Sequence, residues 1–159
     1  MHSIQSVSIR LVALVICVIS FFPVFAQSEP AEEFDPELAA ALGADDYGMR
    51  QYVMAFLKSG PNRSENPEDA QALQRAHLDN IRKMAEAGQL VLAGPFMDRG
   101  EIRGIYLFAV DSVEEAEALT STDPAVQAGS LVMELHPWYG SAALMKVNDL
   151  HAQIAKFDP

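Results

Sequence analysis

The chain has 159 residues, of which 22 are acidic and 11 basic, so its formal net charge is −11. A surface this acidic repels phosphate backbones and anionic lipid headgroups, which argues against nucleic-acid binding and against a membrane-surface protein. The single cysteine, Cys17, allows no internal disulfide, so packing has to stabilise the fold.

The first 26 residues have the pattern of a secretory signal peptide. A polar segment carrying Arg10 precedes an apolar run from Leu11 to Phe22, and the small residues Val24 and Ala26 follow. The run is shorter than the roughly 20 apolar residues that a membrane span needs. We therefore expect cleavage after Ala26, a periplasmic or secreted protein, and no membrane association afterwards. An uncleaved N-terminal anchor is the alternative.

Cleavage would leave 133 residues, enough for one domain with its own core. It removes Arg10 and no acidic residue, so the net charge becomes −12. Residues 27–48 are acidic, contain two prolines and show no sustained alternation, which predicts an exposed tether with a short helix from Pro36 to Leu42. The domain itself is expected at 49–159.

The first half of this domain predicts a strand, a loop and a long helix. The strand covers Arg50–Lys58, where aromatic and aliphatic residues dominate. The loop "SGPNRSEN" follows, and its last residue, Asn66, is a good N-cap before Pro67. The helix is expected to run to Ala87 and to stop at Gly88.

The second half predicts three further strands and a shorter helix. This helix covers 112–121 and begins with a capping box, Ser112 with Glu115. One helical turn is possible after Pro124, and residues 142–157 fit either an amphipathic helix or a partly extended tail. The three strands cover 90–96, 103–110 and 131–138.

The order β-α-β-β-α-β is the ferredoxin-like pattern, an α+β fold with a four-stranded antiparallel sheet and both helices on one face. The second face should then be polar, but Tyr52, Met54 and Phe56 make it apolar. Something must cover it. We expect a homodimer formed through this sheet face; the C-terminal segment folding over the face is the competing explanation.

The last strand carries polar groups on the same open face. Alternation directs Leu131 and its i+2 neighbours toward the helices, and Val132, Glu134, His136 and Trp138 away from them. Glu134, His136 and Trp138 are therefore candidates for a pocket rim that contacts substrate, or for the dimer interface. His136, beside a proline, fits a structural or interfacial role better than a catalytic one.

His77 stands out on the long helix, because it lies on the apolar stripe four residues from both Leu73 and Ile81. A histidine in such a place is more often a hydrogen-bonded core residue than a catalyst. The alternative is a side chain that lines a pocket and transfers protons.

Three segments together resemble the YCII-related domain family: "YVMAFLK", "AHLDNIRKMAEAGQLVLAGPF" and "TDPAVQAGSLVMELHPW". The resemblance covers about residues 50–147. It implies a ferredoxin-like, usually dimeric fold with a histidine–aspartate site, which falls on His77 and Asp123. Most members have no assigned substrate, and one branch removes HCl from chlorinated aromatic hydroxy compounds. The signal peptide, the tether and the "SGPNR" loop set this chain apart from small cytoplasmic members.

A His–Asp pair can perform proton transfer, because the aspartate holds one imidazole nitrogen protonated and leaves the other as a base. Lyase, isomerase or dehydrohalogenase chemistry needs little more than this base and a place for negative charge. Arg63 or Lys58 could provide that place. We expect no cofactor, and no metal site, because the four histidines lack ligand spacing.

Three functions fit these observations. The first is an exported, cofactor-free lyase or isomerase acting on a small molecule through His77 and Asp123. The second is a non-catalytic dimer that binds a small ligand or a partner protein. In the third, His77 is structural, and Asp123 before Pro124 is only a turn residue.

Overall fold

The computed structural model describes residues 33–98 and 100–157. The compact unit is Phe34–Pro159, and the fold below is that of this unit alone. The predicted signal peptide, residues 1–26, lies outside the described residues, as does the beginning of the predicted tether. None of the helices within 33–98 and 100–157 is long and apolar enough to cross a membrane.

The described chain forms helices and strands close to those predicted, and most boundaries agree within one or two residues. The largest difference is at the last strand, which runs three residues past Trp138 because it pairs with the first strand along its whole length, from Met49↔Ser141 to Ser59↔Leu131. In chain order the elements are α1 (Pro36–Ala41), β1 (Met49–Ser59), α2 (Pro67–Glu86), β2 (Leu90–Pro95), β3 (Ile102–Phe108), α3 (Val113–Thr120), α4 (Pro124–Gln127), β4 (Leu131–Ser141), the 3-10 helix η1 (Ala142–Lys146) and α5 (Val147–Ile154).

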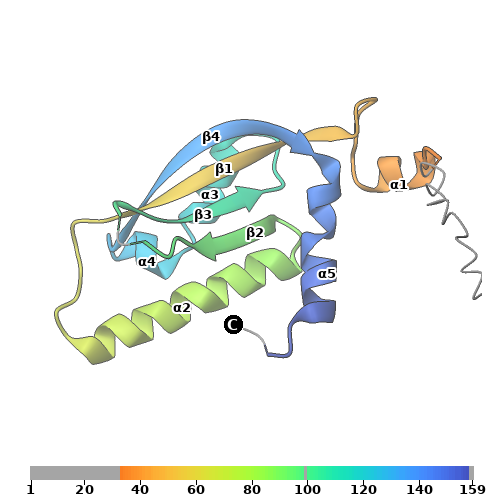
Figure 1. Ribbon diagram of the computed structural model, residues 1–159. Coiled ribbons are helices and arrows are strands. Elements are labelled where there is room, and N and C mark those ends of the chain that lie inside the picture. Colours follow the sequence, from red (N-terminus) through yellow and green to blue (C-terminus); the bar gives the residue numbers. More distant parts are fainter. Residues whose placement is uncertain (1–32, 99, 158–159) are drawn as a thin grey trace, which may run out of the picture. The chain divides into compact units, whose positions relative to one another are not determined.

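The four strands form one sheet in the order β2-β3-β1-β4, and every neighbouring pair is antiparallel. Figure 1 shows this order, with the long helix α2 running beside β2. The sequence of elements and the strand order confirm the predicted α+β, ferredoxin-like fold.

The main core lies between the sheet and the two helices α2 and α3. Val53, Ala55 and Leu57 project from the central strand β1 into this layer and are at most 5% exposed. Met84 of α2 and Ala116 of α3 pack against them. The strict i, i+2 spacing on β1 therefore places the helices on one face of the sheet.

A second, smaller cluster forms on the opposite face. Tyr52, Val91 and Leu107 are buried there, under Leu144 and Met145 from η1 and Val147 from α5. The Tyr52 hydroxyl donates a hydrogen bond to the Ser141 carbonyl at 2.9 Å. The C-terminal segment thus covers part of the second face, which is one of the two explanations given for that apolar face in the sequence.

The rest of that face remains open in the single chain. Val132 is 46% exposed and Trp138 is 36% exposed, both on β4. At the edge of this open region, Trp138 packs against Tyr52, with ring centroids 5.8 Å apart. A sheet-face dimer would cover this region, and it stays a prediction.

Candidate active site

The helix α2 places His77 on the inner face of the molecule. The Asn66 side chain accepts a hydrogen bond from the Glu68 amide at 2.9 Å, with Pro67 in the first turn, so this end is well capped. The helix ends before Gly88, whose φ of +70° suits a residue without Cβ. Between these ends only His77 and Met84 are buried, and His77 retains 8% exposure.

Asp123 is the direct partner of this histidine. Its carboxylate lies 2.8 Å (Oδ2) and 3.0 Å (Oδ1) from His77 Nδ1, and the residue is fully buried. The same carboxylate is the N-cap of α4, where Oδ1 accepts the Ala125 amide at 2.8 Å. Asp123 therefore caps the turn before α4 and contacts the His77 ring at the same time.

A third polar group, Tyr106, completes the cluster and was missed by the sequence analysis. Its hydroxyl comes from β3 and lies 3.3 Å from Asp123 Oδ2 and 3.3 Å from His77 Nε2. Burial, followed by the charge and the hydrogen-bond acceptance of Asp123, raises the pKa of the Tyr106 phenol above its ordinary value. The phenol therefore remains a hydrogen-bond donor at neutral pH.

The signal for Tyr106 was present but weak. It shares a strand face with Phe108, which packs in the main core, so alternation places it inside. A buried tyrosine hydroxyl usually needs a partner. Nothing in the local pattern indicated that the partner would be Asp123, because that contact depends on how β3 lies against α2 and α4.

These contacts define the protonation pattern of the histidine. A buried carboxylate requires donors, and Asp123 has three: the His77 ring N–H, the Tyr106 hydroxyl and the Ala125 amide. An ionised carboxylate only accepts, so the proton of the neutral ring lies on Nδ1. His77 Nε2 is then left as the basic nitrogen.

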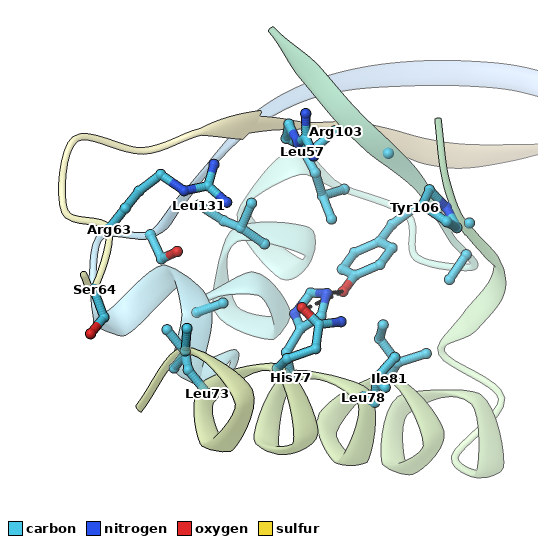
Figure 2. A pocket seen from close by; sticks show the side chains of 18 residues that line it. Leu57, Arg63, Ser64, Leu73, His77, Leu78, Ile81, Arg103, Tyr106 and Leu131 are labelled. Atoms are coloured by element: carbon cyan, nitrogen blue, oxygen red, sulfur yellow. Dashed lines mark hydrogen bonds between the residues drawn. The ribbon is translucent and has the colours of Figure 1, made fainter. Parts of the chain in front are cut away.

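A cavity of about 500 Å³ adjoins this cluster. It lies between α2 and the sheet, as Figure 2 shows, and the β1–α2 loop, α4 and the start of β4 complete its wall. His77 rises into it from the helix, and Tyr106 reaches down toward His77 from the opposite side. A volume of this size is typical of sites for small molecules.

Most of the cavity wall is apolar. Leu57, Leu73, Leu78, Ile81 and Leu131 contribute large side chains. The polar side chains among the lining residues are Arg63, Ser64, Gln74, His77, Arg103, Tyr106 and Ser130. This combination of apolar walls with a few polar groups favours an organic ligand over a hydrated ion.

Of the five predicted substrate contacts, only Arg63 lines this cavity. The other four do not line it, because the even-numbered positions of β1 and β4 point to the opposite face of the sheet, where alternation placed the three residues of β4. They are Lys58, Glu134, His136 and Trp138.

These residues interact with one another instead. Lys58 forms an ion pair with Glu134, and His136 Nε2 lies 2.9 Å from Glu134 Oε1. Hydrogen bonds, first from Lys58 and then from His136, lower the pKa of the Glu134 carboxyl. The three side chains form an exposed polar cluster beside the open part of the second face. Within residues 33–98 and 100–157, no group of three His, Cys, Asp or Glu side chains is placed to hold a metal ion.

Comparisons with known proteins show the family to which this chain belongs. Among solved structures, 5-chloro-2-hydroxyhydroquinone dehydrochlorinase from Burkholderia phenoliruptrix, in complex with 2,5-dihydroxybenzoquinone, is 15% identical and matches with a TM-score of 0.42. The match covers 56% of this chain and 93% of that chain. No curated protein matches the chain. The family model of the YCII-related domain matches residues 51–139, which is more than half of the chain. The match begins within β1 and ends within β4. The chain belongs to the YCII-related domain family.

Proposed function

We propose that this protein is an exported, cofactor-free lyase or isomerase that transfers protons on a small organic molecule. The observation that carries the proposal is the hydrogen bond between His77 Nδ1 and buried Asp123, made at the wall of a 500 Å³ cavity. Export rests on the signal-peptide pattern of residues 1–26.

The proposed reaction begins with His77 Nε2 as the base. It takes a proton from an activated C–H or O–H group of the substrate, and the electron pair remains on the substrate as an enolate or phenolate. Asp123 stabilises the imidazolium that forms, because its negative charge is already in hydrogen-bond contact with the ring. The proton then returns at another position, in an isomerase, or a leaving group departs with the electron pair, in a lyase.

Tyr106 would assist by donating a hydrogen bond to the developing negative charge. Its hydroxyl lies 3.3 Å from both Asp123 Oδ2 and His77 Nε2, so a substrate oxygen bound beside His77 Nε2 would lie within its reach. Its raised pKa keeps the proton in place for this purpose. The phenol thus provides the place for negative charge that the reaction requires.

An assay that does not require the natural substrate to be known tests this proposal. The purified protein is incubated in D2O with a panel of small ketones and hydroxylated aromatic compounds, and loss of C–H signals is followed by NMR. We expect catalysed exchange that falls by at least about a hundredfold in His77→Gln, since general bases contribute about 10² to 10⁴ in rate. Unchanged exchange in His77→Gln would contradict the assignment.

The second candidate function is a non-catalytic dimer. It is favoured by the open sheet face, where Val132 and Trp138 stay partly exposed beside the Lys58–Glu134–His136 cluster. Under this alternative, members of the panel bind in the cavity but none exchanges protons, and His77→Gln binds them as tightly as the wild-type protein.

A further inference from the structure

The cavity has a local charge opposite to that of the whole protein. The chain carries twice as many acidic as basic residues, yet the described residues that line the cavity include two arginines and no aspartate or glutamate. Asp123 lies behind His77, fully buried, and does not reach the cavity surface. An anion is repelled by the net charge of the molecule, but the arginines at this cavity attract it.

Both arginines have donors to spare. Arg63 is exposed on the loop between β1 and α2, and one of its N–H groups donates to Ser59 Oγ at 3.2 Å. Arg103 is half-buried at the start of β3 and donates to the Gly100 carbonyl at 3.4 Å. Neither makes an ion pair with a carboxylate of the described residues. A guanidinium has five N–H donors, so most of each fork is available to a ligand.

The loop that carries Arg63 is held in position by the main chain. The Gly60 amide donates to the Ser130 carbonyl at 2.8 Å, and the Asn62 amide donates to the Gly129 carbonyl at 3.0 Å. Figure 2 shows the Arg63 side chain reaching from this loop toward the cavity. The "SGPNR" loop therefore holds the backbone of Arg63 at the cavity rim before any ligand binds, so binding does not have to order the loop.

From this arrangement we infer that the substrate is a small organic anion, a carboxylate or phenolate on a largely apolar skeleton. Arg63 and Arg103 hold its negative charge, and the skeleton lies against the leucines of α2 and the sheet. The inference builds on the proposed function, since it names the substrate class of the site where His77 is the base. It assigns Arg103 as a second binding residue that the sequence did not indicate.

Three probes of nearly equal shape test the inference: benzoate, benzamide and benzamidine, which are anionic, neutral and cationic. Their binding is measured by NMR titration of the His77 ring signals, so only binding close to the cavity is counted. We expect benzoate to bind at least about tenfold more tightly than benzamide, since a charge-assisted hydrogen bond contributes that much affinity or more, and benzamidine to bind most weakly.

Charge-neutralising variants locate the binding groups. Arg63→Gln and Arg103→Gln should each weaken benzoate binding by about tenfold and leave benzamide binding within about twofold. Arg75→Gln is the matched control: it removes the same charge from the same part of the chain, but Arg75 is exposed on α2 and does not line the cavity. Its benzoate affinity should stay within about twofold of wild type. Equal melting temperatures of the variants would show that the fold is retained.

The inference is overturned if benzamide or benzamidine binds as tightly as benzoate, if benzoate affinity ignores both cavity arginines, or if none of the three probes binds at millimolar concentration. Its failure is separable from failure of the proposed chemistry. A wild-type protein that selects benzoate over benzamide but exchanges no protons with any member of the panel would disprove the acid–base role and leave the anion site standing.

Discussion

At the scale of single residues, Asp123 performs two tasks that sequence analysis treats as alternatives. Its carboxylate caps α4 through Oδ1 and contacts the His77 ring mainly through Oδ2. The capping bond is local, two residues apart, and an Asp-Pro step predicts it. The histidine contact spans 46 residues and follows only from the fold.

This double role gives a stability prediction. Asp123→Ala removes the cap and leaves the His77 N–H and the Tyr106 hydroxyl without their acceptor in a buried site, so the free energy of unfolding should fall by about 3 to 5 kcal/mol. Urea denaturation measures it. The control is Asn66→Ala, the cap of α2, which also precedes a proline and accepts a single amide two residues on. It should cost only about 1 kcal/mol. Equal losses would mean that the buried contacts of Asp123 contribute nothing.

Tyr106 gives a prediction about alkaline stability. Its pKa is raised in the folded protein, so the unfolded chain releases this proton first, near the ordinary value of 10.0. The stabilisation from the protonated phenol is complete below about pH 10 and is lost as the pH rises further. Tyr106→Phe should therefore show a shallower fall in unfolding free energy above pH 10 than the wild-type protein.

The comparison is made by urea denaturation at several pH values between neutral and strongly alkaline. Tyr47→Phe is the control, because Tyr47 is 86% exposed. Its alkaline slope should match that of the wild-type protein. Equal slopes for Tyr106→Phe and wild type would contradict the raised pKa.

At the scale of elements, the individual helices and strands were predicted well, but the way in which they pair and pack was predicted less well. Helix α2 has local signals at both ends, the Asn66 cap and Gly88, and its bounds were predicted within one residue. The end of β4 has no such signal, because it is set by pairing with β1. The cavity is lined by residues of α2, of the sheet and of the segments between them. Its lining, including Arg103 and Tyr106, depends on how these elements pack against one another, so it could not be predicted.

The contact between the Arg63 loop and the turn before β4 can be tested by adding a single methyl group. A Cβ on Gly60 would lie 2.1 Å from the Gly129 carbonyl oxygen, so Gly60→Ala must separate the Arg63 loop from the turn before β4. We expect a loss of about 2 kcal/mol in unfolding free energy, typical of overpacking. Gly94→Ala is the control, since a Cβ there meets nothing within 4 Å; it should stay within about 0.5 kcal/mol. A neutral Gly60→Ala would show that this close approach is absent in solution.

At the scale of the whole molecule, the question is what covers the open part of the second sheet face. The C-terminal segment covers Tyr52 and Leu107 but leaves Val132 and Trp138 partly exposed. A second copy of the chain would bury them and would also desolvate the Lys58–Glu134–His136 cluster. We propose this homodimer on the ground that an exposed apolar sheet face needs a partner.

Sedimentation analysis tests the dimer. The wild-type protein should sediment as a dimer, and Val132→Glu should raise its dissociation constant by at least about tenfold, because it would bury an added charge in the dimer interface. Ile154→Glu on α5 is the control, since Ile154 is 82% exposed and lies outside the sheet. A monomeric wild-type protein would contradict the proposal and leave the open face unexplained.

We infer that Asp123 keeps the proton of the neutral His77 ring on Nδ1 and leaves Nε2 as the base. A proton–nitrogen correlation spectrum of the His77 ring, in the wild-type protein and in Asp123→Asn, tests it most directly. In the variant, the Ala125 amide should hold the amide oxygen at the Oδ1 position, so the NH2 group faces Nδ1. We predict Nδ1–H in the wild-type protein and a change to Nε2–H in Asp123→Asn, with loss of proton exchange. Protonated Nε2 in the wild-type neutral ring, or a spectrum that the substitution leaves unchanged, would contradict the account.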